Sequence, residues 1–289
     1  MSFLITGANG QVGRELVVRS RPGEAVAMDR ENLDIADPVA VAAVIAQHRP
    51  SAVINAAAYT AVDKAEADAD AAFAANRDGP SALAQACAAA GIPLFHLSTD
   101  YVFDGCQVEP YTEQSLTHPL GVYGQSKWEG EEAIRRHLSR HLILRVSWVF
   151  GAYGNNFVRT MLRVGRERDE LQVVADQRGA PTHAGAIAEA LLELVRRLPA
   201  DLPWGTYHYT GAPATTWHGF ALTIFEEALS LGLLERMPVV HAITTVEYPT
   251  PARRPANSEL GSAALQTLGL SAAPWVDGLR ETLLAWRQQ

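Results

Sequence analysis

Length, composition and charge set the first limits on this protein. The chain has 289 residues, of which 48% are hydrophobic, which is enough to bury a sizeable core in one large domain or two modest ones. Its net charge of −8 at pH 7 argues against generic binding to nucleic-acid phosphate. The N-terminal residues lack the pattern of a signal peptide, and no apolar stretch reaches the roughly 18 residues of a membrane-spanning helix. We therefore expect a cytoplasmic protein with neither nucleic acid nor a membrane as its partner.

The chain contains two cysteines, Cys87 and Cys106. Because they form no Cys-x-x-Cys pair, a zinc ribbon and a redox dithiol are excluded. Two free thiols in a reducing compartment are the simpler interpretation, and a disulfide between them is left open.

Short apolar runs alternate with helical segments over the first half of the chain. We expect strands at Phe3–Thr6, Ala25–Met28, Ala52–Asn55, Leu94–Leu97 and Leu142–Val146. We expect helices at Val12–Val18, Val39–Gln47, Asp63–Ala90 and Tyr123–Arg136. Because parallel strands need a long crossover between them, this alternation predicts an α/β protein with a Rossmann-type, doubly wound parallel sheet.

The pattern changes after about residue 150. We expect Leu171–Val174 as a strand and Ala184–Leu198 as a helix, both still within the sheet domain. Beyond Pro199 the segments become irregular and richer in proline and tryptophan. We therefore predict a first domain at residues 1–150 plus about 171–199, and a smaller C-terminal lobe at about 151–170 and 200–289.

Three glycines follow the first expected strand. Gly7 permits a tight turn, Gly10 lets the backbone approach a pyrophosphate, and Gly13 lets the following helix pack on the strand. The helix N-terminus adds N–H donors and a positive dipole end. The spacing is Gly-x-x-Gly-x-x-Gly rather than the commoner Gly-x-Gly-x-x-Gly, but its place between a strand and a helix is typical of a dinucleotide site. The predicted cofactor contacts in this turn are Gly7, Asn9, Gly10, Gln11, Val12 and Gly13.

Charged residues after the second strand bear on the type of dinucleotide. Asp29 follows the glycines by about 20 residues, where a carboxylate can bind the adenosine ribose hydroxyls of NAD. Arg30 comes next and can instead bind a 2′-phosphate. The pair leaves the choice between NADH and NADPH open. We expect Asp34 and Ile35 beside the adenine.

A tyrosine and a lysine four residues apart, Tyr123 and Lys127, would share one face of a helix. A nearby ammonium stabilises a phenolate and so lowers the pKa of a tyrosine. Such a tyrosine can protonate a carbonyl oxygen while hydride reaches the carbon. Thr99 ends the fourth strand, close to where ligands bind in such sheets, and its hydroxyl can hold the same oxygen.

This set of motifs resembles the extended short-chain dehydrogenase/reductase superfamily, whose members act on nucleotide-sugars. Longer phrases resemble one of its families, the dTDP-4-dehydrorhamnose reductases. These phrases span nearly the whole chain and are residues 7–13, 55–66, 98–105, 145–150, 154–157, 176–182, 248–252 and 254–258.

The resemblance implies an NADPH- or NADH-dependent reduction of the C4 keto group of dTDP-4-dehydro-β-L-rhamnose to dTDP-L-rhamnose. Carried over by position, the catalytic residues are Thr99, Tyr123 and Lys127. The further cofactor contacts that it implies are Ala56, Ala57, Ala58, Thr60, Asn76, Tyr123 and Lys127. The substrate contacts that it implies in the cleft between the lobes are Val62, Thr99, Asp100, Tyr101, Trp148, Asn156 and Arg254. For Arg254, binding the diphosphate and capping a loop remain open alternatives.

Some members of the family bind Mg²⁺ through glutamates at a dimer contact. Glu15 matches one of these positions, but Gly185 and Ala285 stand where the other two are expected. A hard cation prefers several oxygen ligands, so we predict no metal site here and expect Glu15 to be a plain helix-surface residue. A homodimer is left open.

Three alternatives belong to related proteins. A nucleotide-sugar dehydratase carries Asp-Glu after the strand-end threonine, whereas here Asp100 is followed by Tyr101. An epimerase is disfavoured by the family phrases. A non-catalytic subunit similar to the methionine adenosyltransferase β subunit is disfavoured by the intact Thr99, Tyr123 and Lys127. Reduction of another dTDP-4-keto-6-deoxy sugar would leave the same motifs.

Overall fold

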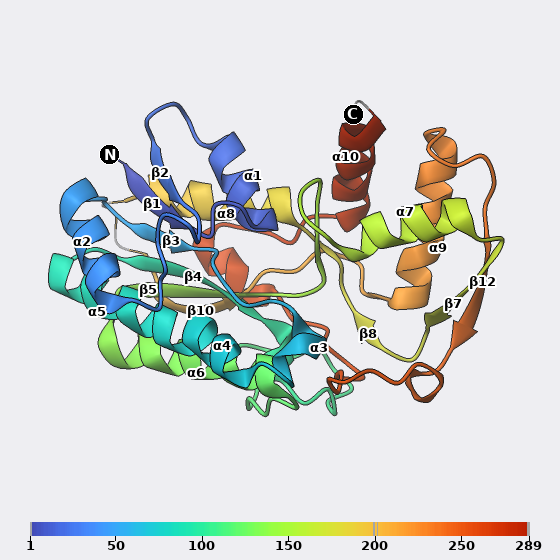
Figure 1. Ribbon diagram of the computed structural model, residues 1–289, viewed down its shortest axis with the longest axis horizontal. Helices are drawn as coiled ribbons and strands as arrows, with labels where there is room; N and C mark the ends of the chain where they lie inside the picture. The colour runs from blue at the N-terminus through green and yellow to red at the C-terminus, as the bar shows by residue number, and fades with distance from the viewer. Residues whose placement is uncertain (1, 199, 201, 288–289) are drawn as a thin grey trace.

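A six-stranded parallel sheet organises the larger part of the structure, a computed structural model that describes residues 2–198, 200 and 202–287 (Figure 1). Across the sheet the order is β2 (Ala25–Met28), β1 (Phe3–Thr6), β3 (Val53–Asn55), β4 (Leu94–Thr99), β5 (His141–Val146) and β10 (Gly205–His208). The chain order therefore reverses between β1 and β3, the switch point at which open α/β sheets bind ligands.

Helices cover both faces of this sheet. One face carries α1 (Gln11–Arg19) and α8 (Ala184–Arg196), and the other carries α2 (Pro38–His48), α5 (Gly79–Ala90) and α6 (Val122–His137). Successive strand residues point to opposite faces, so Ile5 packs into the first layer and Leu4 into the second. This arrangement confirms the predicted Rossmann-type, doubly wound fold. Within the described residues, no helix is long and apolar enough to cross a membrane.

The predicted single helix at Asp63–Ala90 is wrong. The segment folds as α3 (Val62–Ala65), α4 (Ala69–Phe73), a π-helical turn at Ala74–Asp78, and α5. The alanine-rich composition hid the two interruptions, because alanine favours a helix without fixing where one begins. The π-helical turn contains the buried Asn76, and such turns are frequent at functional sites.

The predicted strand at Leu171–Val174 lies outside the central sheet, whereas a segment predicted to be irregular and part of the lobe supplies a strand of that sheet. Strand β7 (Glu170–Val174) pairs in parallel with β12 (Val239–Ile243), and β10 rather than β7 is the sixth strand of the central sheet. Buried and exposed residues alternate along the first four positions of β7, which is typical of a strand with one covered face and not of a strand buried on both. The ends of the predicted domain ranges at residues 1, 199 and 289 lie outside the described residues.

A second hydrophobic core lies beside the sheet. It is built by β7, β12 and three helices, α7 (Phe157–Glu167), α9 (Trp217–Ser230) and α10 (Trp275–Arg287) (Figure 1). Shorter pairs, β6 (Val149–Phe150) with β9 (Thr182–His183) and β8 (Arg178–Gly179) with β11 (Thr215–Thr216), lie in the segments that connect the two parts.

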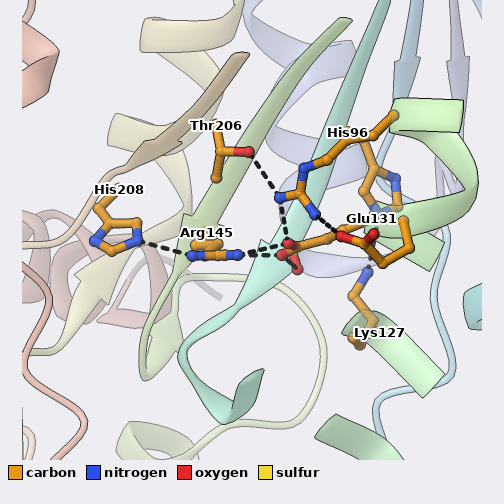
Figure 2. Close-up of polar contacts among 9 residues, drawn as sticks. His96, Lys127, Glu131, Arg145, Thr206 and His208 are labelled. Carbon is orange, nitrogen blue, oxygen red and sulfur yellow. Dashed lines mark hydrogen bonds and ion pairs between the residues drawn. The ribbon is translucent and has the colours of Figure 1, made fainter. Parts of the chain in front are cut away.

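A buried ion pair joins α6 to the sheet. Arg145 on β5 donates two hydrogen bonds, of 2.9 and 2.7 Å, to the carboxylate of Glu131 on α6. Ser98 on β4 donates a third, of 2.6 Å, and Arg135 donates a fourth, of 2.8 Å. Figure 2 shows Glu131 between Arg145 and the region of Lys127 and His96. Burial favours the neutral acid, but the hydrogen bonds and positive charge of Arg145 outweigh it and lower the pKa of Glu131 to about 2.

Replacing Arg145 with methionine is expected to lower the free energy of unfolding by about 3–5 kcal/mol, because Glu131 would keep a buried charge without its main partner. Urea unfolding measures this change. The matched control is Arg163→Met on α7, whose ion pair with Glu167 is exposed and is expected to contribute about 0.5 kcal/mol or less. Equal effects of the two variants would contradict the structural role of Arg145.

Candidate active site

The turn after β1 brings three parts of the backbone close together. Gly7 has φ +72°, and a Cβ atom there would lie 2.5 Å from the amide nitrogen of Ala57. A Cβ atom on Gly13 would lie 2.0 Å from the carbonyl oxygen of Gly7. Side chains at either position would push α1 or the segment after β3 away from the turn. The two glycines therefore shape a narrow crevice at the switch point.

A cavity of about 280 Å³ opens at this crevice. It is lined by ten of the predicted cofactor residues, namely Gly7, Asn9, Gly10, Asp29, Arg30, Asp34, Ile35, Ala56, Ala57 and Ala58. It lies at the carboxyl ends of β1, β2 and β3, where a dinucleotide binds in this type of sheet.

Other predicted cofactor residues do not line this cavity. Val12 packs into the core behind the turn, and Thr60 is exposed just beyond the cavity. Gln11 accepts a 3.1 Å hydrogen bond from Asn156 and so links the turn to α7. Asn76 bonds both backbone groups of Tyr59, at 2.8 and 3.0 Å, and holds the segment after β3 in place. Its amide also donates to Ser126 on α6.

The Asp29 carboxylate is held by its own loop. It accepts hydrogen bonds from Asn32 and Glu31, and a 2.7 Å bond from the Asn9 side chain. The side-chain bond from Asn32 is the main reason that its pKa is lowered, with the Asn32 backbone next. Arg30 is exposed at the same edge of the cavity. The carboxylate that suits a ribose and the guanidinium that suits a phosphate thus lie side by side.

The three predicted catalytic residues lie at the end of β4 and the start of α6. Tyr123 and Lys127 are one helical turn apart on α6, and the Lys127 ammonium nitrogen donates to the Leu97 carbonyl of β4 at 2.6 Å. Thr99 ends β4 and lies beside Tyr123. Its hydroxyl donates to the Asp100 carboxylate at 2.9 Å. The Tyr123 ring packs edge-on against Tyr101, with 5.5 Å between ring centroids. The structure thus brings the predicted residues together.

Burial is the largest influence on the pKa values of Tyr123, Lys127 and Asp100. It raises the pKa of Tyr123 to about 12, while the nearby Thr99 hydroxyl acts in the opposite direction. It lowers the pKa of Lys127 to about 8 and raises that of Asp100 to about 6. The predicted lowering of the Tyr123 pKa by Lys127 is therefore wrong for this structure. A high pKa keeps the tyrosine protonated at neutral pH, which suits a proton donor.

The proposed substrate side is formed by aromatic residues. Trp148 follows β5 with φ +45°, a backbone conformation that is costly for a bulky side chain. Its indole stacks on Trp217 at 3.7 Å between centroids and donates to Ser258 at 3.1 Å. A second cavity, of about 340 Å³, adjoins this stack and is lined by Phe157, Thr160, Met161, Gln172, Val173, Val174, Gln177, Trp217, Tyr248, Thr250 and Arg254.

Two predicted substrate residues already have partners within the protein. Arg254 donates two hydrogen bonds to the Asp63 carboxylate, at 3.0 and 2.8 Å, and also bonds Thr250. Asn156 caps α7 through its side-chain oxygen and donates to Gln11. Val62 begins α3 next to Asp63 and is partly buried. The substrate contacts of these residues stay predictions.

Glu15 is not a surface residue as predicted, because it is only 4% exposed. Arg19 lies 2.9 Å from it and also contacts Glu189 at 3.3 Å and Glu281 at 2.5 Å. A Cβ atom on Gly185 would lie 2.4 Å from this guanidinium, so the glycine leaves room for it. Three carboxylates thus surround a cation supplied by the chain itself. Among the described residues, no group of histidine, cysteine, aspartate or glutamate has the arrangement to hold a metal ion.

Sequence reasoning missed several residues of these cavities. Asp63 and Tyr248 stand inside the family phrases but received no role, and the ion pair of Asp63 with Arg254 joins residues 191 positions apart, which no sequence signal indicates. Gln177 and Trp217 both line the second cavity. Gln177 lies just before β8 and Trp217 begins α9, and the sequence pattern does not show that these two segments are close together.

Comparison with known proteins agrees with this geometry. The family model described as RmlD substrate binding domain matches residues 1–287. A dTDP-4-dehydrorhamnose reductase of Aggregatibacter actinomycetemcomitans is 44% identical over 96% of this chain and 97% of its own length. One from Sinorhizobium fredii is 45% identical over 99% of this chain and 97% of its own. The crystal structure of the Bacillus anthracis dTDP-4-dehydrorhamnose reductase in complex with NADP superposes with a TM-score of 0.91, at 36% identity, over 98% and 99% of the two chains. With the predicted family and oxidoreductase class confirmed, the chain belongs to the dTDP-4-dehydrorhamnose reductases.

Proposed function

We propose that this protein reduces the C4 keto group of dTDP-4-dehydro-β-L-rhamnose to give dTDP-L-rhamnose, with NADPH or NADH as reductant. The observation that carries the proposal is that Thr99, Tyr123 and Lys127 meet at the end of β4, the strand that pairs with β3, and the dinucleotide-type cavity opens at the carboxyl end of β3. The family relationship supports the choice of sugar nucleotide.

The crevice suits a nicotinamide dinucleotide. Gly10 caps α1 without a side-chain hydrogen bond, so the first backbone N–H groups of this nine-residue helix are available to a pyrophosphate. Asp29 and Arg30 lie where the adenosine ribose would bind. When bound, the reduced nicotinamide supplies the hydride.

The residues around β4 and α6 would handle the proton and the oxygen. Tyr123 donates its proton to the C4 oxygen as the C4–H bond forms, and its high pKa keeps that proton in place until then. Thr99, beside Tyr123, would hold the same oxygen through its hydroxyl. Lys127 would bind the nicotinamide ribose. Asp100 positions Thr99 through the 2.9 Å hydrogen bond.

The second cavity would take the nucleotide part of the substrate. Its wall of Phe157 and Trp217 offers aromatic faces to a pyrimidine base, and Arg254 offers positive charge to a diphosphate while retaining Asp63 as its partner. We place the sugar between this cavity and Tyr123, against Val62, Tyr101 and Trp148. Asn156, on the first turn of α7, would close this side.

Two further proposals follow from other features of the chain. A cytoplasmic location is supported by Cys87 and Cys106, which are both free thiols. A Mg²⁺ requirement is disfavoured, because Arg19 already supplies positive charge among Glu15, Glu189 and Glu281. A homodimer and the division into a cofactor domain and a nucleotide-sugar lobe stay predictions.

The substrate assignment is tested by following the absorbance of NADPH with dTDP-4-keto-6-deoxyglucose as the sugar. We expect oxidation only when a 3,5-epimerase is added, because the epimerase makes the L-configured ketone. Oxidation without the epimerase would assign the protein to another 4-keto-sugar, and no oxidation in either mixture would contradict the proposed function.

Replacing Tyr123 with phenylalanine is expected to lower kcat by about 10²–10⁴-fold, because the proton donor is lost. NADPH affinity should change little. Tyr207→Phe, on the edge strand β10 and in the core layer of α1 and α8, serves as the matched control, since it removes a hydroxyl that donates to the Pro203 carbonyl. Near-native turnover of the Tyr123 variant would refute its role.

Replacing Arg30 with alanine is expected to raise the KM for NADPH about tenfold or more, while the KM for NADH stays nearly constant. The reason is that only NADPH carries the 2′-phosphate that a guanidinium binds through charge-assisted hydrogen bonds. Steady-state kinetics with each cofactor measures the difference. Arg21→Ala, in the turn that precedes β2 at the opposite end of the sheet, is the control. Equal changes for both cofactors would contradict this contact.

A further inference from the structure

Lys127 has an unusual set of neighbours for a cationic side chain. It is only 2% exposed, and its ammonium nitrogen lies 2.6 Å from the Leu97 carbonyl oxygen and 3.4 Å from His96 Nε2. His96 belongs to β4 and is fully buried. Figure 2 shows the two side chains beside each other, next to Glu131. Which form of Lys127 these neighbours favour depends on which nitrogen of His96 carries the proton.

The position of the His96 proton depends on the side chain of Asn55, the last residue of β3. The atom assigned as Asn55 Oδ1 lies 3.1 Å from the backbone nitrogen of Ala57 and 2.6 Å from the Thr6 hydroxyl. A backbone N–H can only donate, so the Asn55 atom facing it must be the oxygen. The other atom of the amide, Nδ2, is therefore a donor. The turn after β3 thus fixes the orientation of the Asn55 side chain.

Asn55 in turn fixes the tautomer of His96. Asn55 Nδ2 lies 2.9 Å from His96 Nδ1, so Nδ1 must accept this hydrogen bond and carries no proton. Burial, followed by the positive charges of Lys127, His141 and Arg135, holds the pKa of His96 well below its usual value, so the ring is neutral. A neutral imidazole has one proton, and it must then be on Nε2. That N–H points toward Lys127.

An N–H group and an ammonium are both donors, so they cannot form a hydrogen bond with each other. An uncharged amine has a lone pair and can accept from His96 Nε2 while donating to the Leu97 carbonyl. We propose that His96 is a positioning residue that stabilises the amine form of Lys127 through this N–H group, with Asn55 and Ala57 fixing its direction. The inference rests on the catalytic role proposed for Lys127.

Some charged groups around Lys127 and His96 favour the ammonium form of the lysine, and others oppose positive charge there. On α6, Glu131 favours the ammonium, but its carboxylate is already shared by Arg145 of β5 and by Arg135. Arg135, together with His141 of β5 if it is protonated, opposes further positive charge at His96. Burial lowers the pKa of Lys127 to about 8, with Glu131 acting against it. Both forms of the lysine are therefore accessible in the pH range in which such an enzyme is assayed.

The two forms have a use in turnover. Each reduction forms a C4–H bond from the hydride and an O–H bond from the Tyr123 proton, which leaves a phenolate. An ammonium on Lys127 can return a proton toward Tyr123 and become the amine, which then takes a proton from water. His96 lowers the free energy of the amine that this exchange passes through. Without the His96 N–H, Lys127 would hold its proton more tightly.

Nuclear magnetic resonance of ¹⁵N-histidine-labelled protein tests the inference without any substrate. Long-range ¹H–¹⁵N spectra distinguish the two tautomers, and a His96→Gln sample assigns the resonances. We expect the Nε2–H tautomer and a shift of the His96 nitrogens with a midpoint near pH 8, which is lost in Lys127→Met. A proton on Nδ1, a charged ring, or no titration between pH 7 and 9.5 would overturn the proposal. If His96→Gln does not fold, His96→Phe assigns the resonances instead.

The pH profile of kcat separates tuning from a merely structural role. His96→Phe removes the donor, whereas His96→Gln can present an amide N–H near the position of Nε2. We expect the midpoint of the limb that depends on Lys127 to rise by about one unit in His96→Phe, the size of one neutral hydrogen bond, and to return toward the wild-type value in His96→Gln. An equal loss of kcat at every pH with no change of midpoint would contradict the proposal. A protein without turnover would refute the proposed function but leave the spectroscopic result interpretable.

Discussion

The attachment of α6 to the sheet by Glu131 is the constraint on which the proposed active site depends. Glu131 lies one helical turn after Lys127 and is bonded to Ser98 of β4 and Arg145 of β5. Because Thr99 follows Ser98 directly, the same contact that fixes the helix also fixes the distance between Thr99 and the Tyr123–Lys127 face. Burying a charge pair costs desolvation free energy. It also restricts the geometry around it, because few arrangements satisfy all its hydrogen bonds.

The cofactor side depends on close backbone approach instead of charge. Gly7 and Gly13 leave no room for side chains, and this brings the turn after β1 against the segment after β3. In that segment Ala57 donates to Asn55 at the end of β3, and Asn55 in turn donates to His96. The dinucleotide crevice and the environment of Lys127 are therefore parts of one hydrogen-bonded structure. We therefore expect a substitution in the glycine turn to alter the surroundings of Lys127 through the contacts of Ala57, Asn55 and His96.

The sequence predicted the alternating strands, the glycine turn and the residues that meet around Tyr123, because each has a local signal in periodicity or spacing. It did not predict the π-helical turn at Asn76, since the backbone bonds of Tyr59 that hold Asn76 come from a distant segment. The exchange of β7 for β10 in the sheet escaped detection for a similar reason, as strand partners are decided by packing. Glu15 was misplaced because Glu189 and Glu281, which surround its ion-pair partner Arg19, approach only in the folded chain. The tautomer of His96 could not be predicted from the sequence, because it depends on contacts that exist only in the folded chain.

If the protein reduces the C4 keto group of a sugar nucleotide, the source of each new hydrogen in the product is determined. The hydrogen that arrives at C4 must come from the nicotinamide, while the hydroxyl hydrogen comes from Tyr123 and so from water. The decisive measurement is the reaction of the epimerised keto-sugar with NADPH carrying deuterium in the transferable position at nicotinamide C4, followed by NMR of the product. Deuterium at C4 of dTDP-L-rhamnose is the predicted result. Product without deuterium at C4, or NADPH oxidation that leaves the sugar unreduced, would contradict it.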